Sequence, residues 1–294
     1  METPDREKVA TRLLAASVKH SFDPDTEIDW GAQLLEGAWF LPPELCSLYD
    51  TPLWGRMPRE QQIDLSRHEA ACTASMGIWF ELVGMQALLR HCTALDPTTE
   101  HVRYALTEIE EECRHSKMFA REVLRLDTPT YRPGRVDHIL GHFLPALPSS
   151  SIFTALLIAE EVMDWIQRQT VRDERVQPLV RDVMRIHVVE ESRHIRYERE
   201  EMRLRMQSAS RREMEFTRYV SAVVAGVVAR SMIRPQVYAS VGLDPAEAVA
   251  AVRASAHRRE VLVQAAGRLT TFLGDIGLLS GPCRRLWRTS GFLR

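Results

Sequence analysis

The 294-residue chain contains nearly the same pentapeptide twice, EECRH at Glu111–His115 and EESRH at Glu190–His194. Each copy is preceded, 31 residues before its second glutamate, by another glutamate inside an apolar segment, Glu81 in the first half and Glu160 in the second. Apolar residues recur around these positions at the spacing typical of helices. The repeat of both a word and a distance predicts two matching helix pairs that turn polar side chains towards a shared interior.

Helix signals run through nearly the whole chain, and the short alternating β-branched runs that indicate strands are lacking in the sequence. Segments rich in proline and glycine separate the periodic stretches, and no low-complexity linker divides them. The sequence therefore predicts a single all-α domain over 1–294, with a four-helix bundle core and additional packed helices. We expect these helices near residues 5–20, 58–92, 98–126, 150–172, 174–206, 211–232 and 244–277, the metal-binding core being about 58–206.

Charge and cysteine usage exclude several classes of partner. A formal net charge of -2 gives no overall field that would attract nucleic acid or an anionic membrane. The five cysteines are odd in number, scattered and without a C-x-x-C pair, which is typical of reduced thiols. The N-terminal METPDREK lacks a signal-peptide pattern, and the uncharged stretch Tyr219–Ala229 is too short to span a bilayer. We expect a soluble, cytoplasmic protein.

The repeated pentapeptide has the chemistry of a metal site. Residues three apart share a helix face, so the glutamate and histidine of each Glu-x-x-His can reach one point. Two divalent ions would neutralise four buried carboxylates, and oxygen and nitrogen donors favour iron or manganese over structural zinc. A glutamate from each of two helices with Glu-x-x-His from the other two is the arrangement of di-iron and di-manganese bundles. The predicted ligands are Glu81, Glu112, His115, Glu160, Glu191 and His194.

Two positions have alternatives. Glu161 competes with its neighbour Glu160, but the repeat distance and the apolar stripe of this helix both favour Glu160. His187 lies one turn before Glu191 on the same face, whereas the matching position in the first half is Glu108. Spacing alone leaves His187 open between a buried core residue and a seventh donor.

Other polar residues flank the predicted ligands. Glu111 and Glu190 could accept a hydrogen bond from a ligand histidine and fix its tautomer, or lie on solvated helix faces. Arg114 and Arg193 recur in the same way and could pair with these acids or point to water. Three further arginines could anchor a substrate carboxylate, although surface or helix-end charges are more common: Arg196, Arg230 and Arg234.

The stretches SRHEAACTASMGIWFELVGMQALLRH, YALTEIEEECRHSKMFAR and HVVEESRHIRYE resemble the AurF-like arylamine N-oxygenases, non-haem di-iron proteins of the ferritin-like superfamily. The likeness covers roughly residues 28–235 and every predicted metal motif. It implies a ferritin-like bundle. In that family the histidine one turn before the last Glu-x-x-His is a metal ligand, and the resemblance therefore implies that His187 is a seventh donor.

The resemblance also implies a reaction. Two iron ions, with manganese as a substitute, would activate O2 as a peroxo species that oxidises an aromatic amine through hydroxylamine and nitroso stages towards nitro. An external electron donor and a homodimer are implied as well. The alternatives are a di-iron carbon hydroxylase or desaturase and a non-catalytic iron-handling bundle.

Overall fold

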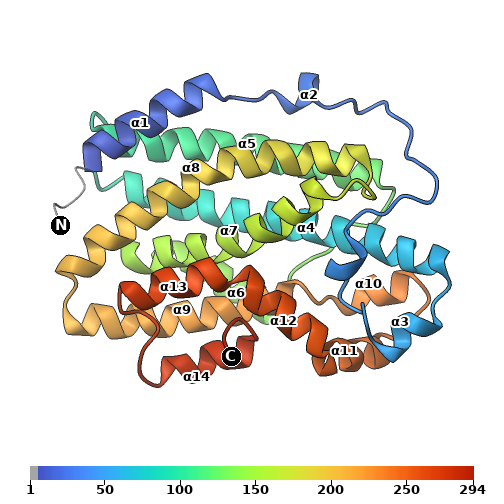
Figure 1. Cartoon of the computed structure of the whole chain (residues 1–294). Coiled ribbons are helices and arrows are strands. Elements are labelled where there is room, and N and C mark those ends of the chain that lie inside the picture. Colours follow the sequence, from blue (N-terminus) through green and yellow to red (C-terminus); the bar gives the residue numbers. More distant parts are fainter. Residues whose placement is uncertain (1–5) are drawn as a thin grey trace.

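The computed structural model describes residues 6–294 and confirms the all-α prediction. The core is a bundle of four long helices in two pairs (Figure 1). Within each pair the helices pack along each other, α4 on α5 and α7 on α8, and contacts between α4 and α7 and between α5 and α8 close the bundle. The four are α4 (Arg59–Cys92), α5 (Glu100–Arg125), α7 (Ser149–Arg172) and α8 (Pro178–Ser208).

The sequence pattern explains which helix faces turn inward. On α5 the buried side chains recur every three or four residues, from Tyr104 through Glu108, Glu112 and His115 to Phe119. This spacing is the stripe that one side of a helix presents to a core. Most of the α7 residues between Ser150 and Val162 are buried, because other helices cover this helix on several sides. The repeated pentapeptides therefore lie on the inward faces of α5 and α8.

Further helices cover the bundle. α1 (Arg6–Lys19) packs across α5 and α8, α9 (Arg211–Ser231) packs on α7, and α14 (Cys283–Ser290) packs on α9. The segment after α1 crosses the end of the bundle (Figure 1) and is held by an isolated bridge between Trp39 and Val176. Four short elements complete these parts of the chain: α2 (Pro24–Glu27), η1 (Pro43–Leu45), α3 (Pro52–Arg56) and α10 (Pro235–Ser240).

Two expectations about the helices were wrong. The single helix expected over 244–277 is three, α11 (Pro245–Ala254), α12 (Ala256–Ala265) and α13 (Gly267–Asp275). The first break occurs because Ser255 adopts an extended backbone and its side chain accepts a hydrogen bond from the Arg258 amide, an N-cap that starts a new helix. The connection expected before residue 150 contains α6 (Arg135–Phe143) and the 3-10 turn η2 (Leu144–Ala146).

Two segments, Arg59–Cys92 and Arg211–Ser240, are long and apolar enough to cross a membrane by composition. Core helices of soluble proteins pass the same test, and both segments pack into the helical assembly described above. They are therefore weak indications of membrane insertion.

Candidate metal centre

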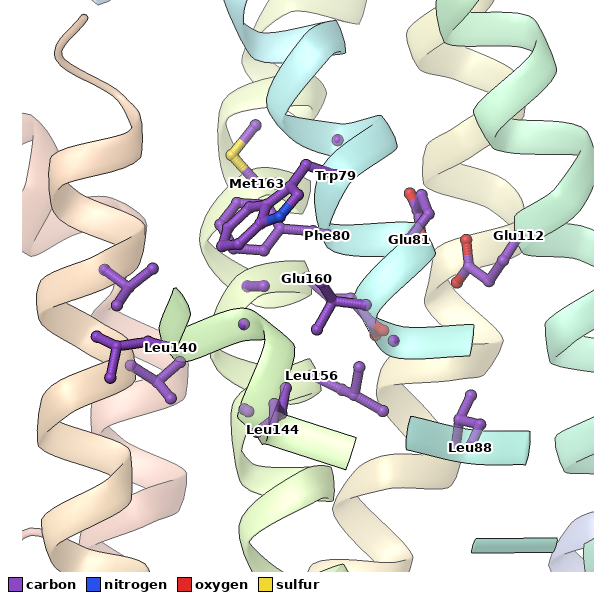
Figure 2. Close-up of a pocket in the computed structure, with 18 of the residues that line it drawn as sticks. Trp79, Phe80, Glu81, Leu88, Glu112, Leu140, Leu144, Leu156, Glu160 and Met163 are labelled. Carbon is purple, nitrogen blue, oxygen red and sulfur yellow. The ribbon is translucent and has the colours of Figure 1, made fainter. Parts of the chain in front are cut away.

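The bundle brings six of the seven predicted donors into two groups that share Glu191. One donor atom from each of Glu81, His115, His187 and Glu191 lies within 4.8 Å of the others, and the same holds for Glu112, Glu191 and His194. Figure 2 shows Glu81 of α4 and Glu112 of α5 facing each other. Every member is buried or nearly so. The donor set consists of carboxylate oxygens and imidazole nitrogens.

The two Glu-x-x-His histidines turn the same nitrogen towards the carboxylates. His115 Nδ1 lies 3.0 Å from Glu112 Oε2, and His194 Nδ1 lies 3.1 Å from Glu191 Oε1 and 3.0 Å from Glu112 Oε1. Neither ring has exposed surface. In both halves, Nδ1 is thus the nitrogen positioned to bind an ion.

The other ring nitrogen of each histidine donates across the bundle to the first glutamate of the opposite pentapeptide. His115 Nε2 donates to Glu190 Oε2 at 2.7 Å, and His194 Nε2 donates to Glu111 Oε2 at 2.8 Å. These two hydrogen bonds give the first glutamate of each pentapeptide a role, because each carboxylate fixes the tautomer of the histidine in the opposite pentapeptide.

The two arginines that recur in the pentapeptides complete this arrangement. Arg193 donates to Glu111 at 2.7 Å and Arg114 donates to Glu190 at 3.3 Å. Burial alone would raise the pKa of Glu111, but the hydrogen bond from His194 and the charge of Arg193 outweigh it and lower that pKa. Two arginines therefore balance two acids beside the centre.

His187 lies on α8 one turn before Glu191 and belongs to the same group as Glu81 and His115. Its Nε2 lies 3.3 Å from Glu81 Oε1 and 3.5 Å from Glu191 Oε1, while its Nδ1 donates to Gln167 Oε1 at 2.7 Å. Sequence reasoning missed Gln167, a buried residue of α7. The available signal was its position two turns after Glu160 on the same helix face.

Glu160 lies apart from the other predicted donors. It forms a third acidic group with Glu108 and Glu198, in which one oxygen of each lies within 4.8 Å of the others. Glu161, the alternative to Glu160, instead accepts two hydrogen bonds from Arg199, the longer at 2.7 Å.

The third acidic group marks a difference between the halves of the repeat. Phe119 packs against His187 with ring centroids 4.8 Å apart. When the two halves of the sequence are aligned on their pentapeptides, Glu198 of the second half matches Phe119 of the first, and Glu108 of the first half matches His187 of the second. The Glu160 side of the centre is therefore acidic, and the opposite side is aromatic.

The buried acids fit a pair of cations. Burial and neighbouring carboxylates raise the pKa of Glu81 and Glu160 well above its ordinary value. In the described residues, Glu191 Oε2 and Glu160 Oε2 are buried and accept no hydrogen bond. Burial alone would lower the pKa of His115, but bonds to Glu112 and Glu190 raise it to about 9, so this site attracts positive charge. Divalent ions would supply that charge.

A cavity of about 430 Å³ opens directly onto these acids. Figure 2 shows Glu81, Glu112 and Glu160 at its inner side and the rings of Trp79 and Phe80 along its wall. Side chains of α6, η2 and α9 line the outer part. α6, which the sequence did not predict, therefore covers the cavity.

The approach of α6 to α4 depends on a glycine. A Cβ atom at Gly141 would lie 2.6 Å from Trp79 Cζ2, so a side chain there would push α6 away from this ring. Asp137 of the same helix accepts two hydrogen bonds from Arg230 of α9, at 2.6 and 3.2 Å.

The three arginines considered as substrate anchors lie elsewhere. Arg196 is exposed and pairs with Glu200, Arg230 pairs with Asp137, and Arg234 lines a separate, smaller cavity. Arg196 and Arg230 are exposed, Arg234 is the N-cap residue of α10, and none of the three lines the cavity beside the acids.

The fold and the donor set together define a helical bundle of the di-metal carboxylate class. The chain belongs to the p-aminobenzoate N-oxygenase AurF family, whose model matches residues 3–277. The carboxylate and histidine cluster fits the two-iron cofactor of this family.

Individual relatives add little about activity. The chain is 29% identical over 214 residues to uncharacterised proteins of Mycobacterium bovis and Mycobacterium tuberculosis. The match covers 70% of this chain and spans 62% of those relatives. A solved mutant R2-like ligand-binding oxidase with a reconstituted Mn/Fe cofactor is similar at 13% identity and a TM-score of 0.37, over 98% of this chain and 91% of its own.

Proposed function

We propose that this protein is an O2-dependent non-haem di-iron monooxygenase that oxidises an aromatic amine to hydroxylamine, nitroso or nitro product. Family membership supports di-iron oxygen chemistry. The observation that carries the proposal is that an apolar cavity opens onto the buried acids, because an organic molecule in this cavity would lie beside ions bound by those acids. An iron-storage bundle has no need of such a cavity.

We propose as metal ligands the seven residues predicted from the sequence. His115 and His194 would bind through Nδ1 and His187 through Nε2, the nitrogens that face the carboxylates. Glu111, Glu190 and Gln167 would hold the rings in these tautomers. The full set is Glu81, Glu112, His115, Glu160, His187, Glu191 and His194.

The reduced ions, when bound, would supply the two electrons with which O2 is activated. Formation of the hydroxylamine consumes one O2, two electrons and two protons, forms one N–O bond and releases the other oxygen atom as water. An external donor must return the electrons to the site. The chain contributes the apolar wall, including Trp79 and Phe80, which excludes water from the reacting groups.

The remaining expectations are a cytoplasmic location, a homodimer and no nucleic-acid or membrane partner. The resemblance supports the dimer, and the five free cysteines are consistent with a reducing compartment. Light scattering on the purified chain would test the dimer.

The function is tested by loading the purified chain anaerobically with Fe(II), admitting O2 and supplying a panel of aromatic amines. N-oxidised products in mass spectra support the proposal. Products oxidised only at carbon would refute N-oxygenation and favour a hydroxylase or desaturase. Mineralisation of many irons per chain without organic product would favour iron handling.

A further inference from the structure

The cavity beside the centre has an unusual distribution of charge. Among the described residues that line it, no lysine or arginine is present, and four glutamates lie at the inner end: Glu81, Glu108, Glu112 and Glu160. The rest of the wall is almost entirely aliphatic and aromatic. Away from the proposed metal ions, a carboxylate on a bound molecule would therefore lose its water shell without a lysine or arginine among these residues to pair with it.

The cavity is also large and extended. Its volume of about 430 Å³ lies within the range of roughly 300–1,000 Å³ that is usual for small-molecule sites. It runs from the acids to Phe143 of α6 and to Phe216 and Tyr219 of α9, whose side chains are partly exposed at the surface. It can hold an apolar body longer than a single aromatic ring.

Glu108 is the lining acid that the proposed metal set does not use. It is fully buried, and neither of its carboxyl oxygens has a hydrogen-bond partner among the described residues. Orphaned buried acceptors are rare in folded proteins and usually meet a ligand or an ion. An amino group has the N–H donors that such an acceptor lacks.

We propose that the substrate is an amine with an uncharged, apolar body longer than one ring, and that Glu108 accepts a hydrogen bond from its amino group. This inference rests on the proposed function and specifies its substrate class. It departs from the benzoate of the family description, because the described lining of the cavity has no lysine or arginine that could pair with a carboxylate at the end away from the proposed ions. Glu108 is then a specificity residue that touches substrate.

The charge preference is tested by binding, without turnover. The full chain is loaded with Fe(II) under anaerobic conditions, and equilibrium dialysis compares p-aminobenzoate with its methyl ester, which differs in charge at one end. We expect the ester to bind at least about tenfold more tightly, the size of effect that an unpaired buried charge produces. Equal or tighter binding of p-aminobenzoate would overturn the proposal.

The role of Glu108 is tested with 4-aminobiphenyl and biphenyl, which differ only in the amino group. The amine should bind more tightly to the wild type, and Glu108→Leu should remove roughly fivefold or more of that advantage by deleting the acceptor. Glu108→Gln, which keeps a carbonyl oxygen, should restore it. Glu60→Leu, the same change at an exposed position of α4, is the matched control.

Metal content and circular dichroism exclude a folding defect in these variants. An unaltered amine advantage in a folded, metal-loaded Glu108→Leu would overturn the role of Glu108. If the ester preference is absent while amines are still N-oxidised, this inference fails alone. If the preference is present but O2 gives no N–O product, the proposed function fails.

Discussion

At the scale of single residues, the repeated pentapeptide predicted more than its ligands. Glu111 and Glu190 were candidates for outer hydrogen bonds, and the structure shows each accepting from the histidine of the opposite helix. The crossing itself could not be predicted, because spacing along one helix says nothing about the rotation of its neighbour. Glu160, which the sequence favoured over Glu161, lines the cavity, and its association with Glu108 and Glu198 depends on side-chain directions across three helices.

His187→Ala should keep the helical content but weaken binding of one ion by roughly tenfold or more, since it removes a proposed ligand. The optical spectrum of the iron-loaded protein should change as well. Gln167→Ala should cause a smaller change in the same direction, because it removes the acceptor for His187 Nδ1. Metal titration and absorption spectra provide the measurement. Unaltered affinity and spectrum would make His187 a packing residue.

Glu122 should make the free energy of unfolding depend on pH, independently of the metal centre. It is fully buried without a partner among the described residues, and burial raises its pKa from 4.5 to about 8. Because the pKa of Glu122 is higher in the folded than in the unfolded protein, its contribution to stability is fully present when the pH is below the unfolded-state pKa of about 4.5. This contribution is lost as the pH rises from about 4.5 to about 8.

Glu122→Gln should therefore become more stable relative to wild type by on the order of 3 kcal/mol between pH 5 and pH 8. Urea unfolding at the two pH values measures this difference. Glu60→Gln, at an exposed position, should show no such trend. A difference between Glu122→Gln and wild type that is independent of pH would contradict the assignment.

At the scale of elements, long helices were predictable and short ones were not. The four bundle helices lie within a few residues of their predicted positions because each has a sustained apolar period. α6 was read as a connection, since Arg135–Phe143 is short and lies between proline-rich segments. Its stability comes from contacts that the local sequence does not encode, such as the Asp137–Arg230 pair.

Asp137→Asn should loosen α6, because it removes the charge that accepts two hydrogen bonds from Arg230. The arginine is about half exposed, so we expect a cost of only about 1 kcal/mol, equivalent to roughly fivefold faster amide exchange over Arg135–Phe143. Hydrogen exchange with mass spectrometry measures this directly. Exchange in α5 and α8 is the internal control and should be unaffected. Unaltered exchange in α6 would show that other contacts hold it.

At the scale of the whole molecule, the fold gathers like charges in its core. These charges would destabilise the core if no cations balanced them. Four long helices place the acids of both halves around one interior, and two arginines neutralise only Glu111 and Glu190. The proposed ligand carboxylates are left for cations to balance. Removing metal with a chelator should therefore lower the melting temperature, since an ion at a thousand times its dissociation constant contributes about 4 kcal/mol.

The central claim is that the two matching helix pairs hold two metal ions. Its most direct test is metal analysis of the purified chain after anaerobic Fe(II) loading and removal of free iron. We predict about two irons per wild-type chain and a loss of bound iron in a folded variant that combines Glu112→Ala with His194→Ala. A well-ordered wild-type chain that takes up neither iron nor manganese would contradict the account.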